Sequence, residues 1–414
     1  MRSRCSLIAV ASLIVLFPTR PFAQQPTPNN VQFAPPIVFR YPASYPQAIA
    51  SGDLRNNGIP DLIAGDEYGG LYAKLSRGNG TFRSWQYVSF PGHYVSALAV
   101  GKFDGKNLDA VVNDISDAWV LLGGGGGGFP RTTWLNAGGN FVTGFAVGDF
   151  RGDGKQDVAA LVDVPGQNSD SSAVYLYLGN GDGTFQPPEQ LPVSSLGPVA
   201  ILAGDFNGDG ELDLAVLSVY LHNHVGRVSV LLGDGKGGFG HPIVFPLYGL
   251  YPKYPVAMAL GDFDDDQTSD LALAYADATS NKSSFVQILL GNGDGTFRRG
   301  VRASAGPNPV SVASADFNGD GIPDLVVANS PCYTACRYPS SVSVLLGNGN
   351  GTFQPPARFP VHGQTSLQLT VADFNGDGKP DVATVNVNSQ SVSVLLNTTQ
   401  FPAPKASAAR RLRH

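Results

Sequence analysis

Short acidic segments with a fixed spacing of oxygen-bearing side chains recur along this sequence. The segment Ala315–Asp324 reads ADFNGDGIPD, and close copies are Ala372–Asp381 (ADFNGDGKPD) and Gly204–Asp213 (GDFNGDGELD). Counted from the first aspartate, carboxylate or amide oxygens occupy positions 1, 3, 5 and 9, and glycine usually occupies position 6. A tight loop turns alternate side chains inward, so these oxygens would converge. Calcium takes about six to eight oxygen ligands in irregular geometry, so this pattern predicts calcium binding.

Four loops hold the complete set of oxygen-bearing side chains. The residue at position 7 is expected to add its backbone carbonyl, which predicts about four calcium sites with a structural role. The predicted ligands are Asp205, Asn207, Asp209, Glu211, Asp213, Asp262, Asp264, Asp266, Thr268, Asp270, Asp316, Asn318, Asp320, Ile322, Asp324, Asp373, Asn375, Asp377, Lys379 and Asp381. The position 7 residues, which would bind through their carbonyls, are Glu211, Thr268, Ile322 and Lys379.

Three further loops depart from the pattern. Arg55 and Arg151 take position 3 in the first and third loops, where a guanidinium could replace the ion. Lys102 takes position 1 in the second loop, which is also one residue shorter, so no metal is expected there. The alternative is that all these loops are simple turns, because turns favour Asn, Asp and Gly. The carboxylates of the four complete loops would then repel one another without relief.

The elements that position these loops follow from an internal repeat. Seven units, spaced 47 to 57 residues apart, are marked by position 1 of each loop: Asp53, Lys102, Asp149, Asp205, Asp262, Asp316 and Asp373. In the sixth unit, four short β-rich runs alternate with turn signals: Pro309–Ala315, Asp324–Asn329, Ser341–Leu346 and Pro355–Val361. A four-stranded unit repeated seven times predicts an all-β fold, a seven-bladed β-propeller.

The ends of the repeat region predict how the ring closes. The last unit stops after its third run, Ser391–Leu396, whereas Phe33–Tyr41 resembles the fourth run of another unit, Phe239–Pro246. The N-terminal segment is therefore expected to complete the last blade and remove a free sheet edge. Recurring phenylalanines are expected to pack between blades. These are Phe82, Phe129, Phe185, Phe239, Phe297 and Phe353 after the glycine-rich turn, and Phe150, Phe206, Phe263, Phe317 and Phe374 after the first aspartate.

The pairing of DFNGDG loops with turns such as Leu289–Phe297 (LLGNGDGTF) resembles the FG-GAP/VCBS repeat family, whose best-known members are the integrin α-subunit heads. The resemblance covers about residues 31–400 and is to a secreted member of bacterial type. It implies a seven-bladed propeller with calcium in the loops that join each first strand to its second. It also implies that calcium is concentrated in the later blades.

The first residues have the features of a secretory signal peptide. Arg2 and Arg4 precede the apolar run Leu7–Phe17, which is shorter than the roughly 18–20 residues of a membrane span, and cleavage is expected after Ala23. The expected layout is a signal peptide at 1–23, a linker at 24–30, the propeller at 31–400 and a disordered basic tail at 401–414. A secreted, periplasmic or cell-surface location follows. In that oxidising setting, a disulfide is expected between Cys332 and Cys336.

Composition and motifs narrow the function. The formal net charge of −6 argues against nucleic acid as a partner. No catalytic constellation stands out, because the six histidines are scattered and nearly all carboxylate pairs belong to the acidic loops. The sequence therefore predicts a monomeric, non-enzymatic, adhesion-like binding module for extracellular protein or glycan.

Variable loops are expected to carry the contacts, together with Trp85, Trp119 and Trp134. These loops span residues 163–172, 220–226, 247–254 and 277–284 and the segment around the two cysteines. The tryptophans could instead fill gaps in the two most divergent blades. The runner-up function is a propeller-fold lyase or glycosidase acting on polysaccharide, and a third alternative is a scaffold with no ligand pocket.

Overall fold

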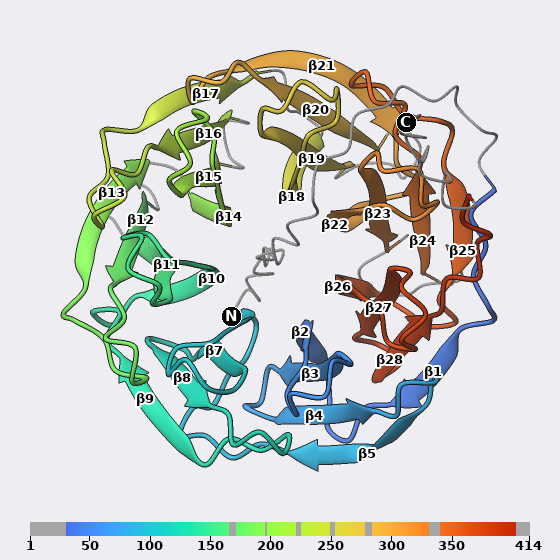
Figure 1. The fold of residues 1–414 in the computed structure, drawn as a ribbon, viewed down its shortest axis with the longest axis horizontal. Coiled ribbons are helices and arrows are strands. Elements are labelled where there is room, and N and C mark those ends of the chain that lie inside the picture. Colours follow the sequence, from blue (N-terminus) through green and yellow to red (C-terminus); the bar gives the residue numbers. More distant parts are fainter. Residues whose placement is uncertain are drawn as a thin grey trace, which may run out of the picture.

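The protein forms a ring of β-sheets around a central axis (Figure 1). The computed structural model describes residues 30–164, 171–194, 197–220, 225–248, 253–277, 284–330 and 340–402. These residues form seven four-stranded antiparallel sheets, so the fold is the seven-bladed β-propeller that the sequence predicts. Within this described part, no helix is long and apolar enough to span a membrane.

Six blades are consecutive in the chain, and each runs from an inner strand near the axis to an outer strand on the rim (Figure 1). Blade 1 comprises β2 (Pro46–Gly52), β3 (Asp61–Asp66), β4 (Leu71–Ser76) and β5 (Phe82–Tyr87). Blade 2 comprises β6 (Leu98–Gly101), β7 (Asp109–Asn113), β8 (Ala118–Leu122) and β9 (Arg131–Leu135). Blade 3 comprises β10 (Phe141–Gly148), β11 (Asp157–Val164), β12 (Ser171–Tyr177) and β13 (Glu189–Ser194). Blade 4 comprises β14 (Gly197–Gly204), β15 (Asp213–Tyr220), β16 (Val225–Leu231) and β17 (Ile243–Leu247). Blade 5 comprises β18 (Lys253–Gly261), β19 (Asp270–Asp277), β20 (Phe285–Gly291) and β21 (Phe297–Ser304). Blade 6 comprises β22 (Pro309–Ala315), β23 (Asp324–Asn329), β24 (Ser341–Leu345) and β25 (Ala357–Pro360).

Blade 7 is built from both ends of the repeat region, as predicted. It comprises β26 (Ser366–Ala372), β27 (Asp381–Asn386), β28 (Ser391–Leu395) and the N-terminal strand β1 (Ile37–Arg40). Strand β1 runs antiparallel to β28, with Ile37 opposite Val394 and Arg40 opposite Ser391. The ring therefore closes through a sheet and leaves no unpaired edge on β28.

The strand sequences reflect where each strand lies in its blade. All six residues of β23 are buried, because neighbouring blades cover both faces of the middle strands. Its sequence, DLVVAN, is accordingly apolar at consecutive positions. The outer strand β25 alternates between half-buried and exposed residues, since only one of its faces meets another blade. The hydrophobic core is therefore divided into layers between blades.

Phenylalanine pairs join neighbouring blades, as predicted. The rings of Phe206 and Phe297 meet edge-to-face with centroids 5.9 Å apart, and the Gly295 amide donates to the Phe206 carbonyl at 2.9 Å. Equivalent ring pairs are Phe103–Phe185, Phe150–Phe239, Phe263–Phe353 and Phe82–Phe374. The acidic loops of blades 2, 3, 4, 5 and 7 are thereby held against the β-hairpin of the next blade, whereas the first loop has Leu54 in place of the phenylalanine.

The junction between blades 6 and 7 uses different residues for the same contacts. Blade 7 lacks the glycine-rich turn, and there the Asn397 side-chain amide donates to the Phe317 carbonyl at 3.0 Å. The ring of Phe33, from the N-terminal segment, packs on Phe317 with centroids 6.1 Å apart. Both chain ends therefore take part in closing the ring.

Candidate metal centre

The aspartate at position 9 of each acidic loop is the first residue of a second strand and is fully buried. In blade 4, Asp213 Oδ2 accepts the Phe206 amide at 2.7 Å, and Asp213 Oδ1 accepts the Gly233 amide at 2.8 Å. The same two kinds of bond recur at Asp109, Asp157, Asp270, Asp324 and Asp381. This carboxylate therefore ties the acidic loop to the third strand, in blades with and without the complete oxygen set.

The aspartate at position 1 shapes the loop through its two oxygens. Asp205 Oδ1 accepts the Gly208 amide at 2.6 Å, and Asp205 Oδ2 accepts the Gly210 amide at 2.9 Å. Both glycines have positive φ, +76° and +86°, which residues with a Cβ rarely adopt. In blade 5, Asp265 and Gln267 take the corresponding left-handed conformations, with φ of 59° and 68°. The fifth loop therefore keeps the shape of the others at a cost in backbone strain.

In the fifth loop three carboxylates converge. Oxygens of Asp262, Asp264 and Asp270 all lie within 4.8 Å of one another. Calcium–oxygen distances are about 2.3–2.6 Å, so ligands on opposite sides of one ion lie about 5 Å apart, and this cluster has the right size. Asp264 Oδ2 pairs with Arg298 Nη2 at 2.8 Å, whereas Oδ1 is buried and has no hydrogen-bond partner among the described residues. A cation bound in the cluster would give that oxygen a partner.

Burial raises the pKa values of the loop carboxyls. It raises the pKa of Asp270 and of Asp381 to about 7, against the partly compensating effect of the backbone amides that donate to them. It raises the pKa of Asp324 well above its usual range. Neighbouring carboxylates raise all three pKa values further. The buried sites thus disfavour uncompensated negative charge, which a bound cation would supply with a counter-charge.

The two loops with arginine at position 3 show a cation in contact with the position 9 carboxylate. Arg151 Nη2 lies 2.9 Å from Asp157 Oδ1, and Arg151 Nη1 lies 3.4 Å from Asp153 Oδ2. Arg55 binds both oxygens of Asp61, at 2.7 and 3.1 Å. Each guanidinium also donates to a carbonyl at the end of the third strand, that of Gly179 or Ser76. A positive charge is therefore favourable at this place, where it meets the carboxylates at positions 5 and 9 and the carbonyl at the end of the third strand.

The remaining predicted ligands lie in the loops as expected but are engaged with one another. Asn207 donates to Asp209 Oδ2 at 2.8 Å, and Asn318 makes the same bond to Asp320. Lys379 Nζ lies 3.4 Å from Asp377 Oδ2. The residues at position 7 donate their backbone amides to the aspartate at position 5. Metal binding stays a prediction for every residue of the four complete loops, including the carbonyls at position 7 and Asp266, Asp316, Asp373 and Asn375.

The second loop, in which Lys102 takes position 1, makes contacts of its own. Its Asp104 pairs with Arg131 of β9 at 2.8 Å, and the Lys102 amide donates to the side chain of Gln156 in the third loop. The one remaining loop aspartate, Asp109, is held by backbone amides. Both aspartates of this loop therefore have partners within the protein.

Three segments of the chain match one family model. A family model described as FG-GAP-like repeat matches residues 161–216, 262–327 and 333–384, which include the acidic loops of blades 4, 5, 6 and 7. This chain carries FG-GAP-like repeats. The chain is similar to T-cell immunomodulatory protein from Homo sapiens, at 26% identity over 66% of this chain and 46% of that protein. It is also similar to integrin alpha-V from Gallus gallus, at 27% identity over 47% of this chain and 20% of that protein. The chain thus spans less than half the length of these curated relatives.

Solved structures share the fold of this FG-GAP-like propeller. The chain superposes on BBS1N, solved in complex with ARL6DN, with a TM-score of 0.59 over 88% of this chain and 96% of that one, at 12% identity. It also superposes on an Agrocybe aegerita lectin that recognises non-reducing terminal N-acetylglucosamine, with a TM-score of 0.50 over 76% and 80% of the two chains, at 20% identity. At these identities the likeness concerns the fold.

The end of the FG-GAP-like propeller opposite the acidic loops carries exposed aromatic side chains. The loops that precede each first strand and those that join second to third strands lie at this end. Tyr45, just before β2, is 39% exposed, and Tyr68, between β3 and β4, is 68% exposed; their rings are 6.2 Å apart. Ile115, between β7 and β8, is 62% exposed. Sequence reasoning missed this cluster, because the two tyrosines are 23 residues apart in loops without a repeat signal.

The three tryptophans that the sequence suggests as contact residues differ in exposure. Trp134 is 52% exposed on β9, whereas Trp85 is half-buried and donates to the Arg40 carbonyl at 3.0 Å, which holds β1 in place. Trp119 is also half-buried. The predicted variable loops, the predicted disulfide, the signal peptide and most of the basic tail fall largely outside the described residues.

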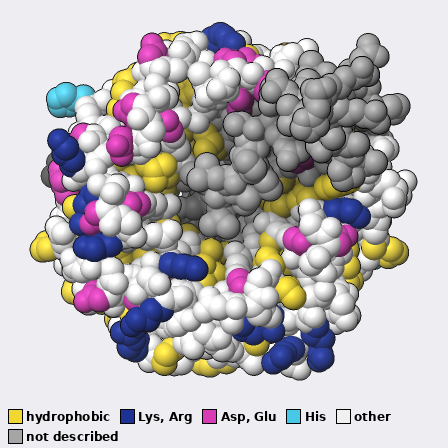
Figure 2. Space-filling model, viewed as in Figure 1, with side chains coloured by type: hydrophobic (Ala, Val, Ile, Leu, Met, Phe, Trp, Pro, Cys, Tyr) yellow, Lys and Arg dark blue, Asp and Glu magenta, His cyan; other side chains and the backbone are white. Residues whose placement is uncertain are grey.

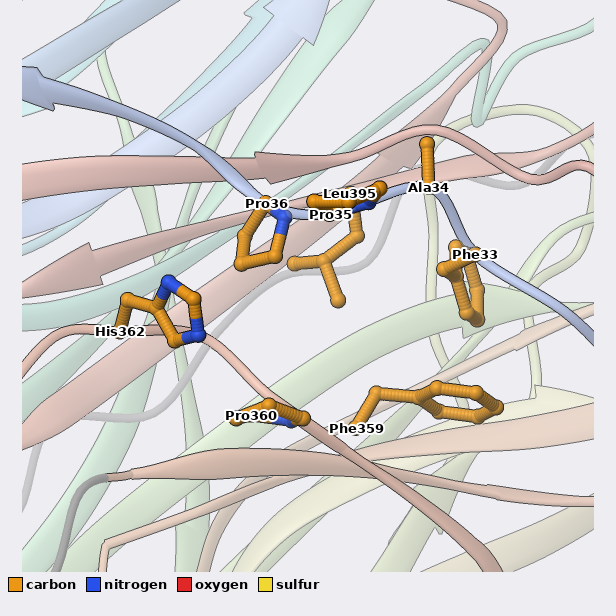
Figure 3. A pocket seen from close by; sticks show the side chains of 8 residues that line it. All are labelled: Phe33, Ala34, Pro35, Pro36, Phe359, Pro360, His362 and Leu395. Carbon is orange, nitrogen blue, oxygen red and sulfur yellow. The ribbon is translucent and has the colours of Figure 1, made fainter.

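A pocket of about 250 Å³ lies between the outer strand of blade 6 and the N-terminal segment. Figure 3 shows Pro36 and His362 at one end of it and the rings of Phe33 and Phe359 at the other. His362 is its one titratable residue, so this pocket offers no acid–base pair. Asp66 of blade 1 and Tyr41, which follows β1 of blade 7, lie close together but are both buried, so they cannot reach a polymer in solution.

Proposed function

We propose that this protein is a secreted, calcium-stabilised propeller that acts as a non-enzymatic binding module for extracellular protein or glycan. Calcium would bind at the acidic loops of blades 4 to 7, as a brace at one end of the ring. Partner contacts would be made at the other end, around Tyr45 and Tyr68. The relatives named above include an integrin α subunit, which is consistent with an adhesion-like role.

The observation that carries the binding role is a pair of exposed aromatic rings at one end of the propeller. Tyr45 is 39% exposed and packs on Tyr68, which is 68% exposed, instead of filling the core. The left-handed φ of Tyr45, 55°, recurs at the corresponding positions before β22 and β26, with 48° at Asn308 and 56° at Thr365, so this backbone turn belongs to the blades. Two exposed tyrosine rings in mutual contact are better explained by contact with a partner than by stability of the fold.

Calcium is supported by two independent features. The Asp262, Asp264 and Asp270 oxygens form a cluster of suitable size, and guanidinium groups contact the corresponding carboxylate in the blades that lack the full oxygen set. When bound, calcium would supply positive charge to carboxylates that burial otherwise disfavours. Its role would be mechanical, because the loops lie at blade junctions.

The test is a binding screen with a matched variant. The purified protein, labelled with a fluorophore, is applied to arrays of glycans and of extracellular proteins, alongside Tyr45→Asn/Tyr68→Ser. We expect specific signals that the double variant weakens by about tenfold, as for hot-spot aromatics, with no loss of thermal stability. Undiminished binding by the double variant would exclude this surface. Release of reducing ends from pectin-type or other polysaccharides, abolished by replacing a carboxylate outside the acidic loops, would contradict the non-enzymatic role.

A further inference from the structure

Two arginines on the outer strand of blade 5 are brought to the same side by a β-bulge. Strand alternation alone would place Arg299 and Arg302 on opposite faces of β21. The pairing of β20 with β21 shifts register, so that Arg302 lies opposite Gln287 and Arg299 lies opposite Leu289. Since Gln287 and Leu289 are two residues apart on β20, both arginines face the same side, toward blade 4.

Each guanidinium is fixed by an aromatic ring and a neutral oxygen. Arg299 Cζ lies 5.2 Å from the centroid of Phe245, and Arg299 Nη2 donates to the Pro246 carbonyl at 2.9 Å. Arg302 Cζ lies 4.8 Å from the centroid of Phe285, and Arg302 Nε donates to Gln287 Oε1 at 3.0 Å. These contacts orient the two groups without neutralising them, and both arginines are exposed.

Neither guanidinium of the pair is neutralised by an ion pair. Across the described ranges, no carboxylate lies within 4.0 Å of the Arg299 or Arg302 side chain, whereas Arg55, Arg131, Arg151 and Arg298 each pair with an aspartate. On the face drawn in Figure 2, basic side chains are scattered among neutral and acidic ones. Other described arginines, such as Arg83 and Arg358, also form no ion pair, so the distinguishing feature is that Arg299 and Arg302 are each fixed over an aromatic ring and share one side of a strand.

A third positive charge lies beside the pair. Lys253 Nζ is 5.2 Å from the centroid of the same Phe285 ring that Arg302 covers. Asp277 is the backbone partner of Lys253 on β19, so an acidic residue stands opposite this lysine in the sheet. The two guanidinium groups are therefore the main source of positive charge at this place, and Lys253 adds to the local positive potential.

We propose that this rim, defined by Arg299, Arg302, Phe245 and Phe285, binds an anionic polysaccharide through carboxylate or sulfate groups on its sugars. Guanidinium forks match such groups with two parallel hydrogen bonds each. Cross-strand partners two residues apart place the arginines roughly 7 Å apart along the strand, a separation that neighbouring charged sugars can bridge. The site lies on the outer edge of the ring, so a long chain can cross it without entering a pocket (Figure 1). The net charge of −6 disfavours a polymer with denser charge, such as nucleic acid.

This proposal is independent of the Tyr45–Tyr68 surface, which lies on another blade. The experiment measures binding of the intact protein to oligogalacturonate, which carries carboxylates, and to dextran sulfate, with neutral dextran and duplex DNA as comparisons. The test variant is Arg299→Gln/Arg302→Gln. The matched control is Arg83→Gln/Arg358→Gln, which makes the same charge change at exposed positions on the outer strands β5 and β25. Titrations at low and at physiological ionic strength give the salt dependence.

The expected result is binding to one or both anionic glycans that the Arg299/Arg302 variant weakens at least about tenfold, since bonds to charged groups are the stronger class. The control pair should change affinity less than about twofold. The relative affinity for the two glycans identifies the anionic group. Failure of the wild-type protein to bind either glycan, equal losses in both variants, or equal affinity for duplex DNA would each overturn the proposal. Replacement of Tyr45 and Tyr68 should leave this binding unchanged, which separates its outcome from that of the proposed function.

Discussion

Arg151 Nη2 lies 2.9 Å from Asp157 Oδ1 in blade 3, on the carboxylate that in blade 5 faces two other aspartates. Asp157 and Asp270 are both fully buried and both accept a phenylalanine amide and a glycine amide. The position 9 carboxylate is thus held alike in the two blades, whereas position 3 is Arg151 in one and Asp264 in the other. A side-chain cation in blade 3 corresponds to the calcium that we propose in blade 5.

The effect of replacing Arg151 on stability should depend on which residue is introduced. Arg151→Ala leaves Asp157 buried without its ion-pair partner, and we expect a loss of about 3 kcal/mol in the free energy of unfolding. Arg151→Asn instead recreates the DFNGDG sequence of blades 4, 6 and 7. Urea unfolding with calcium and with chelator should show that calcium restores stability to the asparagine variant to a greater extent than to the alanine variant. Equal responses of the two variants to calcium would show that the loop makes no new site.

The stabilising effect of calcium should depend on pH. The pKa values of Asp270 and Asp381 are about 7 in the folded protein, above the ordinary value of 3.8. Without metal, the favourable contribution of these protonated groups is complete below about pH 4 and is lost as pH rises through about 7. Calcium needs the carboxylate form, so the calcium-induced rise in melting temperature should be larger at about pH 8 than at about pH 5. A rise of the same size at both pH values would contradict this linkage.

Ring closure should be sensitive to Asn397. This buried side chain donates to the Phe317 carbonyl and accepts the Thr399 amide at 2.9 Å. Asn397→Ala leaves a buried carbonyl without its donor, and we expect a loss of about 2 kcal/mol by urea unfolding. Asn388→Ala, in the same blade, removes an exposed side chain that donates to Thr365 Oγ1 at 2.7 Å, and should cost about 1 kcal/mol or less. Similar losses of unfolding free energy in the two variants would mean that the Asn397 contact has no special role in closing the ring.

Lys74 should make the stability of the protein depend on pH in the alkaline range. It is 5% exposed, its ammonium lies 4.2 Å from the Phe39 ring centroid, and burial lowers its pKa to about 8. The unfolded chain therefore binds more protons than the folded one between about pH 8 and 10.4, so this residue makes stability rise with pH across that range. Urea unfolding at about pH 7.5 and 9.5 should show a relative gain that Lys74→Met lacks. The same gain in the methionine variant would exclude Lys74 as its source.

Much of the fold could be predicted because each blade repeats the same few residues. Strand β22 and strand β23 begin and end where the sequence places them, and pairing of β1 with β28 follows from a missing fourth strand. The position of the acidic loops between first and second strands was also predictable.

The functional surfaces were less predictable, for physical reasons. The buried aspartate at position 9, such as Asp213, binds backbone amides of two segments, a role that ligand spacing does not reveal. The packing of Tyr45 on Tyr68 depends on how two non-repeated loops lie at the end of blade 1. The shared face of Arg299 and Arg302 depends on a bulge, because regular alternation would separate them.

Calcium titration of the metal-free protein by calorimetry tests most directly whether the acidic loops with the complete oxygen set bind calcium. The predicted result is saturable binding of about four ions by the wild-type protein, and one more by Arg151→Asn, at sites with the complete oxygen set. The absence of calcium binding by the wild-type protein, together with a melting temperature unchanged by chelator, would contradict it.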